Sequence, residues 1–118
     1  MFRLVRKIDQ RIIADRLRIA DDFLARFRGL MFVPSISENE GLVLEPCSSI
    51  HMFFMRFPID ALFLDKNGVS VAIYNSLRPW INFSSWHRTA QRVVELKAGI
   101  LAKNSAKLGE EFDILSNL

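Results

Sequence analysis

The sequence has one cysteine, Cys47, and no long apolar run. A single thiol cannot form an internal disulfide, which fits a reducing compartment. Charged residues such as Arg28, Arg56 and Asp60 interrupt the apolar stretches, so none approaches the ~20 residues that a membrane-spanning helix needs. The first residues, MFRLVRKIDQRII, also lack an apolar signal region and a small-residue cleavage site. We therefore expect a cytoplasmic protein without a membrane span.

Internal repeats, low-complexity tracts and linker-like segments are also missing from the chain. Its 118 residues, of which 50% are hydrophobic and 25% charged, have the size and composition of one folded domain with a real core. We predict a single domain over residues 1–118.

The positive charge is concentrated at the N-terminus, although the net charge is only +3. Six of the first eighteen residues are basic and only two are acidic, enough to attract a polyanion weakly. No recognition helix, zinc-finger pattern or RNA-binding aromatic motif accompanies these charges. Alternating arginines are also typical of the solvated face of an edge strand. Weak nucleic-acid binding through a basic N-terminal hairpin is therefore a second alternative that we do not expect.

Hydrophobic periodicity predicts mostly strands. Alternation indicates a hairpin over residues 2–20, and the turn signal DKNG indicates another over residues 60–77. Residues 22–30 have the spacing of a short amphipathic helix, with Asp21 as a candidate N-cap and Gly29 near its end. The apolar runs IHMFFM and IDALFL predict two buried strands. RVVEL favours a strand over a helix, and the segment 78–90 reads as a long loop.

These elements predict an α+β fold that is β-rich. We expect a mainly antiparallel sheet, curled into a sandwich or small barrel to protect its edges, with one or two short helices.

Several motifs together resemble a known family. RFRGLMF, GLVLEP, HMFFMRFPIDALFLDKNGVSV, LRPW and RVVELKAGI are similar to domain of unknown function 192 over roughly residues 12–115. The resemblance implies a compact, β-rich bacterial or archaeal domain that often occurs alone. It implies no established reaction.

The segment CSSIHMFFMRF brings together residue types that suit a soft metal, namely Cys47, His51 and Met52 or Met55. In a strand, however, four residues span about 13 Å, too far for one ion. We therefore expect these side chains to be packed core, and predict neither a metal nor another cofactor. Activation of Cys47 as a nucleophile would need His51 or His87 within hydrogen-bond reach. A metal-handling or thiol-dependent enzyme using Cys47 and His51 remains the alternative.

A buried carboxylate is seldom left without a partner, because desolvating a lone charge is costly. Asp60 begins an apolar strand, so we expect Arg56 or Arg28 to neutralise it, either as a structural ion pair or as the floor of an anion-binding pocket. Trp80, Phe83 and Trp86 in the long loop form either a binding surface or a lid over the core.

We accordingly favour a non-enzymatic binding or accessory module for a small anionic or hydrophobic ligand, or for a peptide or protein partner. The expected site is a cleft between the 78–90 loop and the segment 51–60. Its candidate ligand-binding residues are Arg28, His51, Met55, Arg56, Asp60, Trp80 and Trp86.

Overall fold

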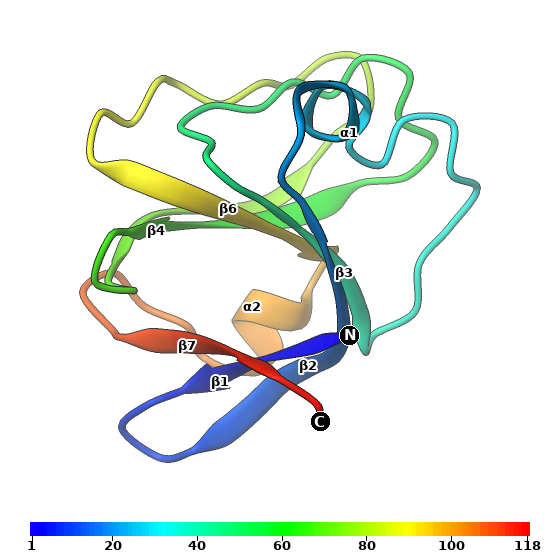
Figure 1. Cartoon of the computed structure of the whole chain (residues 1–118). Coiled ribbons are helices and arrows are strands. Elements are labelled where there is room, and N and C mark those ends of the chain that lie inside the picture. The colour runs from blue at the N-terminus through cyan, green and yellow to red at the C-terminus, as the bar shows by residue number, and fades with distance from the viewer.

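Seven strands form one mixed sheet in the computed structural model, which describes residues 1–118 (Figure 1). The elements are β1 (Phe2–Arg6), β2 (Arg11–Ala20), α1 (Phe23–Arg28), β3 (Glu40–Leu44), β4 (Ile59–Asp65), β5 (Ser70–Leu77), β6 (Ala90–Lys97), α2 (Ile100–Lys103) and β7 (Phe112–Ser116). The strand order is β5-β4-β6-β3-β2-β1-β7, and every neighbouring pair is antiparallel except β2 and β3. The expected β-rich α+β fold with two short helices is confirmed.

The sheet curls strongly but does not close into a barrel. Backbone bonds join the start of β5 to the segment that enters β7, from Ser70 N–H to Glu110 O at 2.9 Å and from Phe112 N–H to Gly68 O at 2.8 Å. The two edges meet only at one isolated bridge, between Val69 and Glu111, and no strand ladder connects them. Of the expected sandwich or small barrel, the curled sheet is present but the barrel is not closed, and these bonds protect the edges as closure would.

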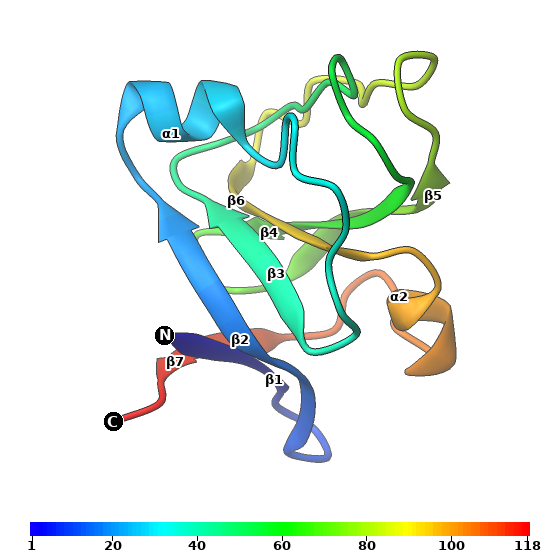
Figure 2. The same cartoon turned by 90° about the vertical axis from the view of Figure 1, so that its right-hand side faces the viewer.

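The two faces of the sheet carry separate hydrophobic clusters because side chains alternate along each strand. In β4, Phe63 belongs to one cluster while Leu62 and Leu64 belong to the other. The cluster with Leu62 is closed by α2, whose Ile100 and Leu101 are buried. The cluster with Phe63 lies beneath the connections at the α1 end of the molecule (Figure 2). As predicted, β4 is covered on both faces.

Helix α1 lies in the crossover that joins the parallel strands β2 and β3 (Figure 2). Its N-cap is Asp22, whose carboxylate accepts the Ala25 N–H at 2.8 Å, and not Asp21 as expected. Gly29 ends the helix with a φ of 49° and donates its N–H to Ala25 O. None of the six helical residues is buried. The expected helix is thus present, but it is shorter than 22–30 and lies exposed on the surface of the molecule.

The predicted strand IHMFFM does not exist. Only His51 makes a bridge, to Phe83, and the rest of residues 47–58 is irregular chain. Its carbonyls serve other loops: Met52 O accepts the Trp80 N–H and Phe54 O accepts the Phe32 N–H. The apolar run arises because buried side chains such as Met52 and Met55 face the core from this loop, while Phe53 and Phe54 are exposed.

The other predicted elements are confirmed. The hairpin of β1 and β2, the hairpin of β4 and β5, and strand β6 all form, and residues 78–89 make a long connection. Asp65 organises the β4–β5 turn by accepting the Asn67 and Val69 N–H groups. Neither helix has the length or apolar character needed to cross a bilayer.

Candidate functional site

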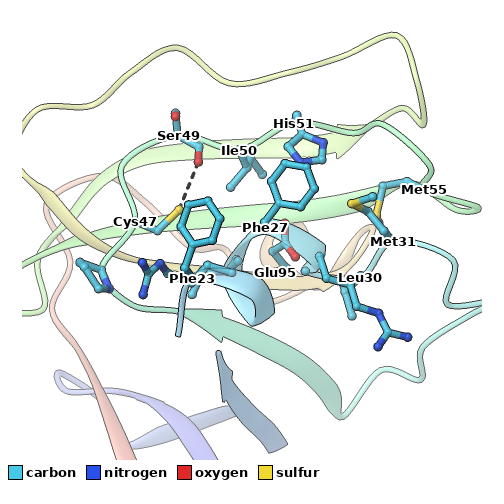
Figure 3. Close-up of a pocket in the computed structure, with 15 residues that line it drawn as sticks. Phe23, Phe27, Leu30, Met31, Cys47, Ser49, Ile50, His51, Met55 and Glu95 are labelled. Atoms are coloured by element: carbon cyan, nitrogen blue, oxygen red, sulfur yellow. Dashed lines mark hydrogen bonds between the residues drawn. The ribbon is translucent and has the colours of Figure 1, made fainter. Parts of the chain in front are cut away.

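A pocket of about 250 Å³ opens beneath α1 (Figure 3). One wall is α1 with the turn that follows it, residues 23 and 26–31. The opposite wall is the irregular chain around Cys47, Ile50 and His51, with Met55 at its far end. Most of the lining is apolar, and Glu95 is among its few charged residues. The pocket is therefore built by two connections standing on the sheet, a usual place for a binding site.

Glu95 forms the floor of this pocket. It lies in β6 between two neighbouring strands, opposite Leu42 of β3 and Ala61 of β4. Strand alternation directs its side chain to the same face as Val93, which is buried in the cluster beneath α1. Figure 3 shows the carboxyl rising into the space below Phe27. A carboxyl group thus occupies a position where the strand pattern calls for an apolar side chain.

The Glu95 carboxyl has no protein partner for one of its oxygens. The residue is 4% exposed, and Oε1 is fully buried without a hydrogen bond. Burial raises the pKa of this carboxyl to about 8, because desolvation disfavours the charged form. The group is therefore mainly protonated at neutral pH. Native structures satisfy most buried polar groups, so an orphaned oxygen facing a cavity is a candidate ligand contact.

Gly29 lies directly beside the Glu95 carboxyl. A Cβ atom at this position would lie 3.5 Å from Glu95 Oε1. The positive φ of Gly29 also disfavours any residue with a side chain there. The sequence placed Gly29 near the end of the helix, and the structure confirms this position.

Cys47 and His51 both line the pocket, but they are not joined to each other. Cys47 Sγ donates to Ser49 O at 3.1 Å, and burial raises the pKa of the thiol. His51 Nδ1 accepts the Phe53 N–H at 3.2 Å. A neutral, half-buried thiol is a poor nucleophile. No three His, Cys, Asp or Glu side chains converge in a way that could hold a metal ion.

His87 lies outside the pocket. Its Nε2 is 2.7 Å from the Tyr74 hydroxyl, and its ring packs edge-on against Phe63 with centroids 4.8 Å apart. The Ser85 N–H donates to the same Tyr74 oxygen at 3.2 Å. This arrangement anchors the long loop to the sheet, and it engages His87 Nε2 with Tyr74 and not with Cys47.

Asp60 is not paired with an arginine, so the expected ion pair is wrong. Its buried carboxyl accepts three backbone N–H groups, from Ser76 at 2.9 Å, Gly99 at 3.0 Å and Leu101 at 2.9 Å. Arg56 and Arg28 are exposed, and neither forms an ion pair with Asp60. Three backbone N–H groups, and not the expected arginine, compensate the cost of burying the Asp60 carboxyl. Asp60 thereby joins the start of β4 to β5 and to the first turn of α2.

Aromatic rings connect the pocket rim to the surface in one continuous series, which we call the aromatic surface. Successive ring centroids along it lie between 4.7 and 6.5 Å apart. All of its members except half-buried His51 are exposed. In order of contact, they are Phe23, Phe27, His51, Phe53, Trp80, Phe54 and Phe32.

Of the seven candidate residues from the sequence, Arg28, His51 and Met55 line the pocket. Trp80 lies on the aromatic surface, and exposed Trp86 donates its indole N–H to Ser48 Oγ. Arg56 and Asp60 belong to neither. Glu95 was missed, although a glutamate inside the apolar run VVEL is the signal of a buried carboxyl in a strand.

The basic N-terminal hairpin is partly neutralised by its own fold. Arg6 is buried, binds Asp9 at 2.9 Å and lies 3.7 Å from Glu110. Lys7 pairs with Glu111 and Asp113. These contacts reduce the positive charge that the hairpin could offer to a nucleic acid.

The fold and site define a small β-rich domain with an apolar pocket roofed by a short helix. The chain belongs to the family DUF192, described as an uncharacterized ACR, whose model matches residues 4–114. A UPF0127 protein from Thermococcus sibiricus is 34% identical over 114 residues, covering 93% of this chain and 73% of that protein. A UPF0127 protein from Thermococcus kodakarensis is 32% identical, covering 86% of this chain and 64% of that protein. Both relatives are archaeal, so the archaeal part of the expectation is supported and the bacterial part is not.

A solved structure shares the fold. The crystal structure of a protein from Sinorhizobium meliloti, named a candidate transcription regulator, superposes with a TM-score of 0.81 and covers 96% of this chain and 91% of that one. Its sequence identity is 22%, so the similarity concerns the fold alone.

Proposed function

We propose that this chain is a single-domain binding module that receives an apolar group in the pocket beneath α1. The observation that carries the proposal is the pocket itself, a mostly apolar cavity of about 250 Å³ with an unsatisfied carboxyl at its floor. A volume slightly below the range of drug-sized sites suits a ligand, or a part of one, about as large as a substituted aromatic ring.

The aromatic surface supports the same function. Exposed aromatic rings that form one contiguous series are typical of interaction sites, whereas single exposed apolar residues are common everywhere. The series begins at Phe23 and Phe27 on the pocket rim and continues to Trp80 and Phe54. A larger ligand or a peptide could therefore place one group in the pocket and lie along these rings.

Backbone strain at this surface is a further supporting observation. Phe32, Phe54 and Trp80 have φ angles of 66°, 62° and 67°. A bulky residue in this region costs on the order of 1 to 3 kcal/mol. Because the three side chains are exposed, burial of those side chains repays only part of this cost. Strained residues of this kind collect at functional sites.

Titration with 2-phenylethanol, followed by amide chemical shifts, tests the proposal. We expect saturable shifts at residues around Cys47, Ile50 and Glu95, and at least fivefold weaker binding in Phe27→Ala. Ile12→Ala is the matched control. Ile12 is an exposed apolar residue at the start of β2, and the β1–β2 turn lies at the opposite end of the molecule from α1 (Figure 1), so its loss should leave binding unchanged. Shifts scattered over the whole surface, or equal weakening in both variants, would contradict a pocket.

Arg28 favours a second candidate, an anionic ligand. It lines the pocket, is exposed, and makes no side-chain hydrogen bond or ion pair within the chain. A guanidinium placed in this way could grip the carboxylate of an apolar acid. In that case Arg28→Gln would weaken binding of 3-phenylpropionate and leave binding of 2-phenylethanol unchanged.

A further inference from the structure

The pocket contains one polar group that the fold itself leaves without a partner. Glu95 is buried, and its Oε1 has no hydrogen-bond donor within the chain. Breaking the partnership of a buried carboxyl normally costs several kcal/mol, so such a group seldom persists without a purpose. Glutamine or leucine at this position would fit the same strand without a potential charge. A carboxyl at this position therefore indicates a ligand that interacts with a carboxyl group.

The charged groups around Glu95 do not supply the missing partner. Arg26 Nη1 donates to Asp21 O at 2.7 Å and lies 3.4 Å from Glu45 O. Arg28 is exposed at the rim and forms no ion pair with Glu95. Cys47 Sγ donates to Ser49 O, His51 Nδ1 accepts the Phe53 N–H, and neither side chain forms a hydrogen bond with Glu95. A cation for Glu95 therefore has to come from outside the chain.

The rim of the pocket also suits a cation. The rings of Phe23 and Phe27 are stacked at 6.5 Å, and the latter lies 5.9 Å from the ring of His51. The faces of aromatic rings attract ammonium groups, and this attraction increases when the cation is desolvated. An amine would thus pass aromatic rings before it reached a carboxyl.

We propose that the ligand of the pocket is a small apolar amine whose ammonium group pairs with the Glu95 carboxylate. This inference rests on the proposed binding function and names the chemical class of ligand. The apolar part of the ligand contacts Ile50, Met55 and Leu30, which line the walls. The amine nitrogen donates to Oε1, the atom that the fold leaves free.

Binding by this route releases a proton. In the free protein burial keeps the carboxyl mainly protonated near pH 7, since its pKa is raised to about 8. An ammonium ion enters with its charge, the carboxyl gives its proton to solvent, and a neutral ion pair remains in the pocket. Close to one proton should therefore leave for each amine bound at pH 6.5, and none for a neutral ligand.

Three probes with the same ring and a similar chain isolate the head group: 2-phenylethylamine, 2-phenylethanol and 3-phenylpropionate. We expect calorimetry to show at least tenfold tighter binding of the amine than of the alcohol. Repetition in two buffers of different ionisation enthalpy should show release of nearly one proton for the amine alone. This proton count uses the native chain and does not depend on any variant folding.

Glu95→Gln keeps the size of the side chain but cannot ionise, so it should abolish proton release and remove the preference for the amine. Its melting temperature at pH 5 should match the native chain, which separates lost recognition from lost folding. Equal binding of amine and alcohol without proton release would overturn the inference and leave the pocket standing. Tightest binding of 3-phenylpropionate, lost in Arg28→Gln, would also overturn it. Failure of all three probes to bind would overturn the proposed function as well.

Discussion

Glu95 makes the stability of the protein depend on pH in an unusual direction. Its pKa is raised from the ordinary 4.5 to about 8 by burial, so the folded state holds a proton that the unfolded state loses. The contribution of Glu95 to the unfolding free energy should therefore be greatest below pH 4.5 and fall as the pH rises towards 8. The full shift corresponds to roughly 5 kcal/mol.

Urea unfolding between pH 5 and pH 8 measures this effect. Glu95→Gln should remove most of the fall in unfolding free energy across that window, because the amide does not titrate. If the native chain and the variant had parallel pH profiles, Glu95 would not be the buried proton-binding group.

Asp60 is a second residue whose side chain contributes strongly to stability. Its carboxyl accepts three backbone N–H groups from two separate segments. Asp60→Ala would leave these donors buried without acceptors, at a cost on the order of 3 to 5 kcal/mol in unfolding free energy. Asp60→Asn keeps one acceptor oxygen and should cost clearly less. Chemical denaturation of both variants tests the order; equal stability of the alanine variant and the native chain would be inconsistent with these bonds.

Among the elements, the contact that draws the two sheet edges together depends on Gly68. A Cβ atom there would clash with Phe112 O, a backbone atom that cannot move aside freely. Gly109 offers a matched control, because its φ of 85° is close to the 82° of Gly68 but nothing lies within 4 Å of its would-be Cβ.

Alanine at either glycine introduces the same left-handed strain, about 1 kcal/mol. Gly68→Ala should cost at least about 2 kcal/mol more, because it also forces Phe112 away and weakens the edge contact. Thermal melts of the two variants measure the difference. Similar melting temperatures would mean that the edges do not depend on this approach.

The sequence predicted those elements whose side chains alternate or whose turns have strong local signals. The β4–β5 hairpin is the clearest case, because Asp65, Asn67 and Gly68 define its turn locally. The failure at IHMFFM has a physical cause: its apolar side chains serve the core from an irregular loop, and the hydrogen bonds that hold it come from Trp80 and Phe32, distant in sequence.

The site was predicted only in part for the same reason. His51, Met55 and Arg28 could be singled out because of their residue types. Glu95 offered only the signal of its apolar neighbours in VVEL, and its burial depends on the two strands that flank β6. Asp60 was correctly expected to need a partner. Its partners are backbone amides, which no residue letter reveals.

For the molecule as a whole, the main asymmetry is between an aromatic end and the opposite end. Phe23, Phe27 and Phe53 of the aromatic surface are 72%, 60% and 52% exposed, at the end that carries α1 and the long loop. Changing all three to serine should shorten retention on a phenyl resin substantially while altering the unfolding free energy only slightly, as for most surface substitutions. The control changes Ile8, Ile12 and Leu115, which are also exposed but lie away from the aromatic surface.

We expect the control variant to be retained almost as long as the native chain. An equal loss of retention in both variants would show that general surface hydrophobicity, and not the aromatic surface, governs adsorption.

The first and last strands, β1 and β7, lie side by side, and Asn117 donates its N–H to Met1 O at 3.1 Å. Both termini therefore leave the molecule together, away from α1 (Figure 1). A tether at either terminus would hold the domain with its pocket facing outward. The protein can accordingly be immobilised or fused through one terminus, and its ligand would still approach from open solvent.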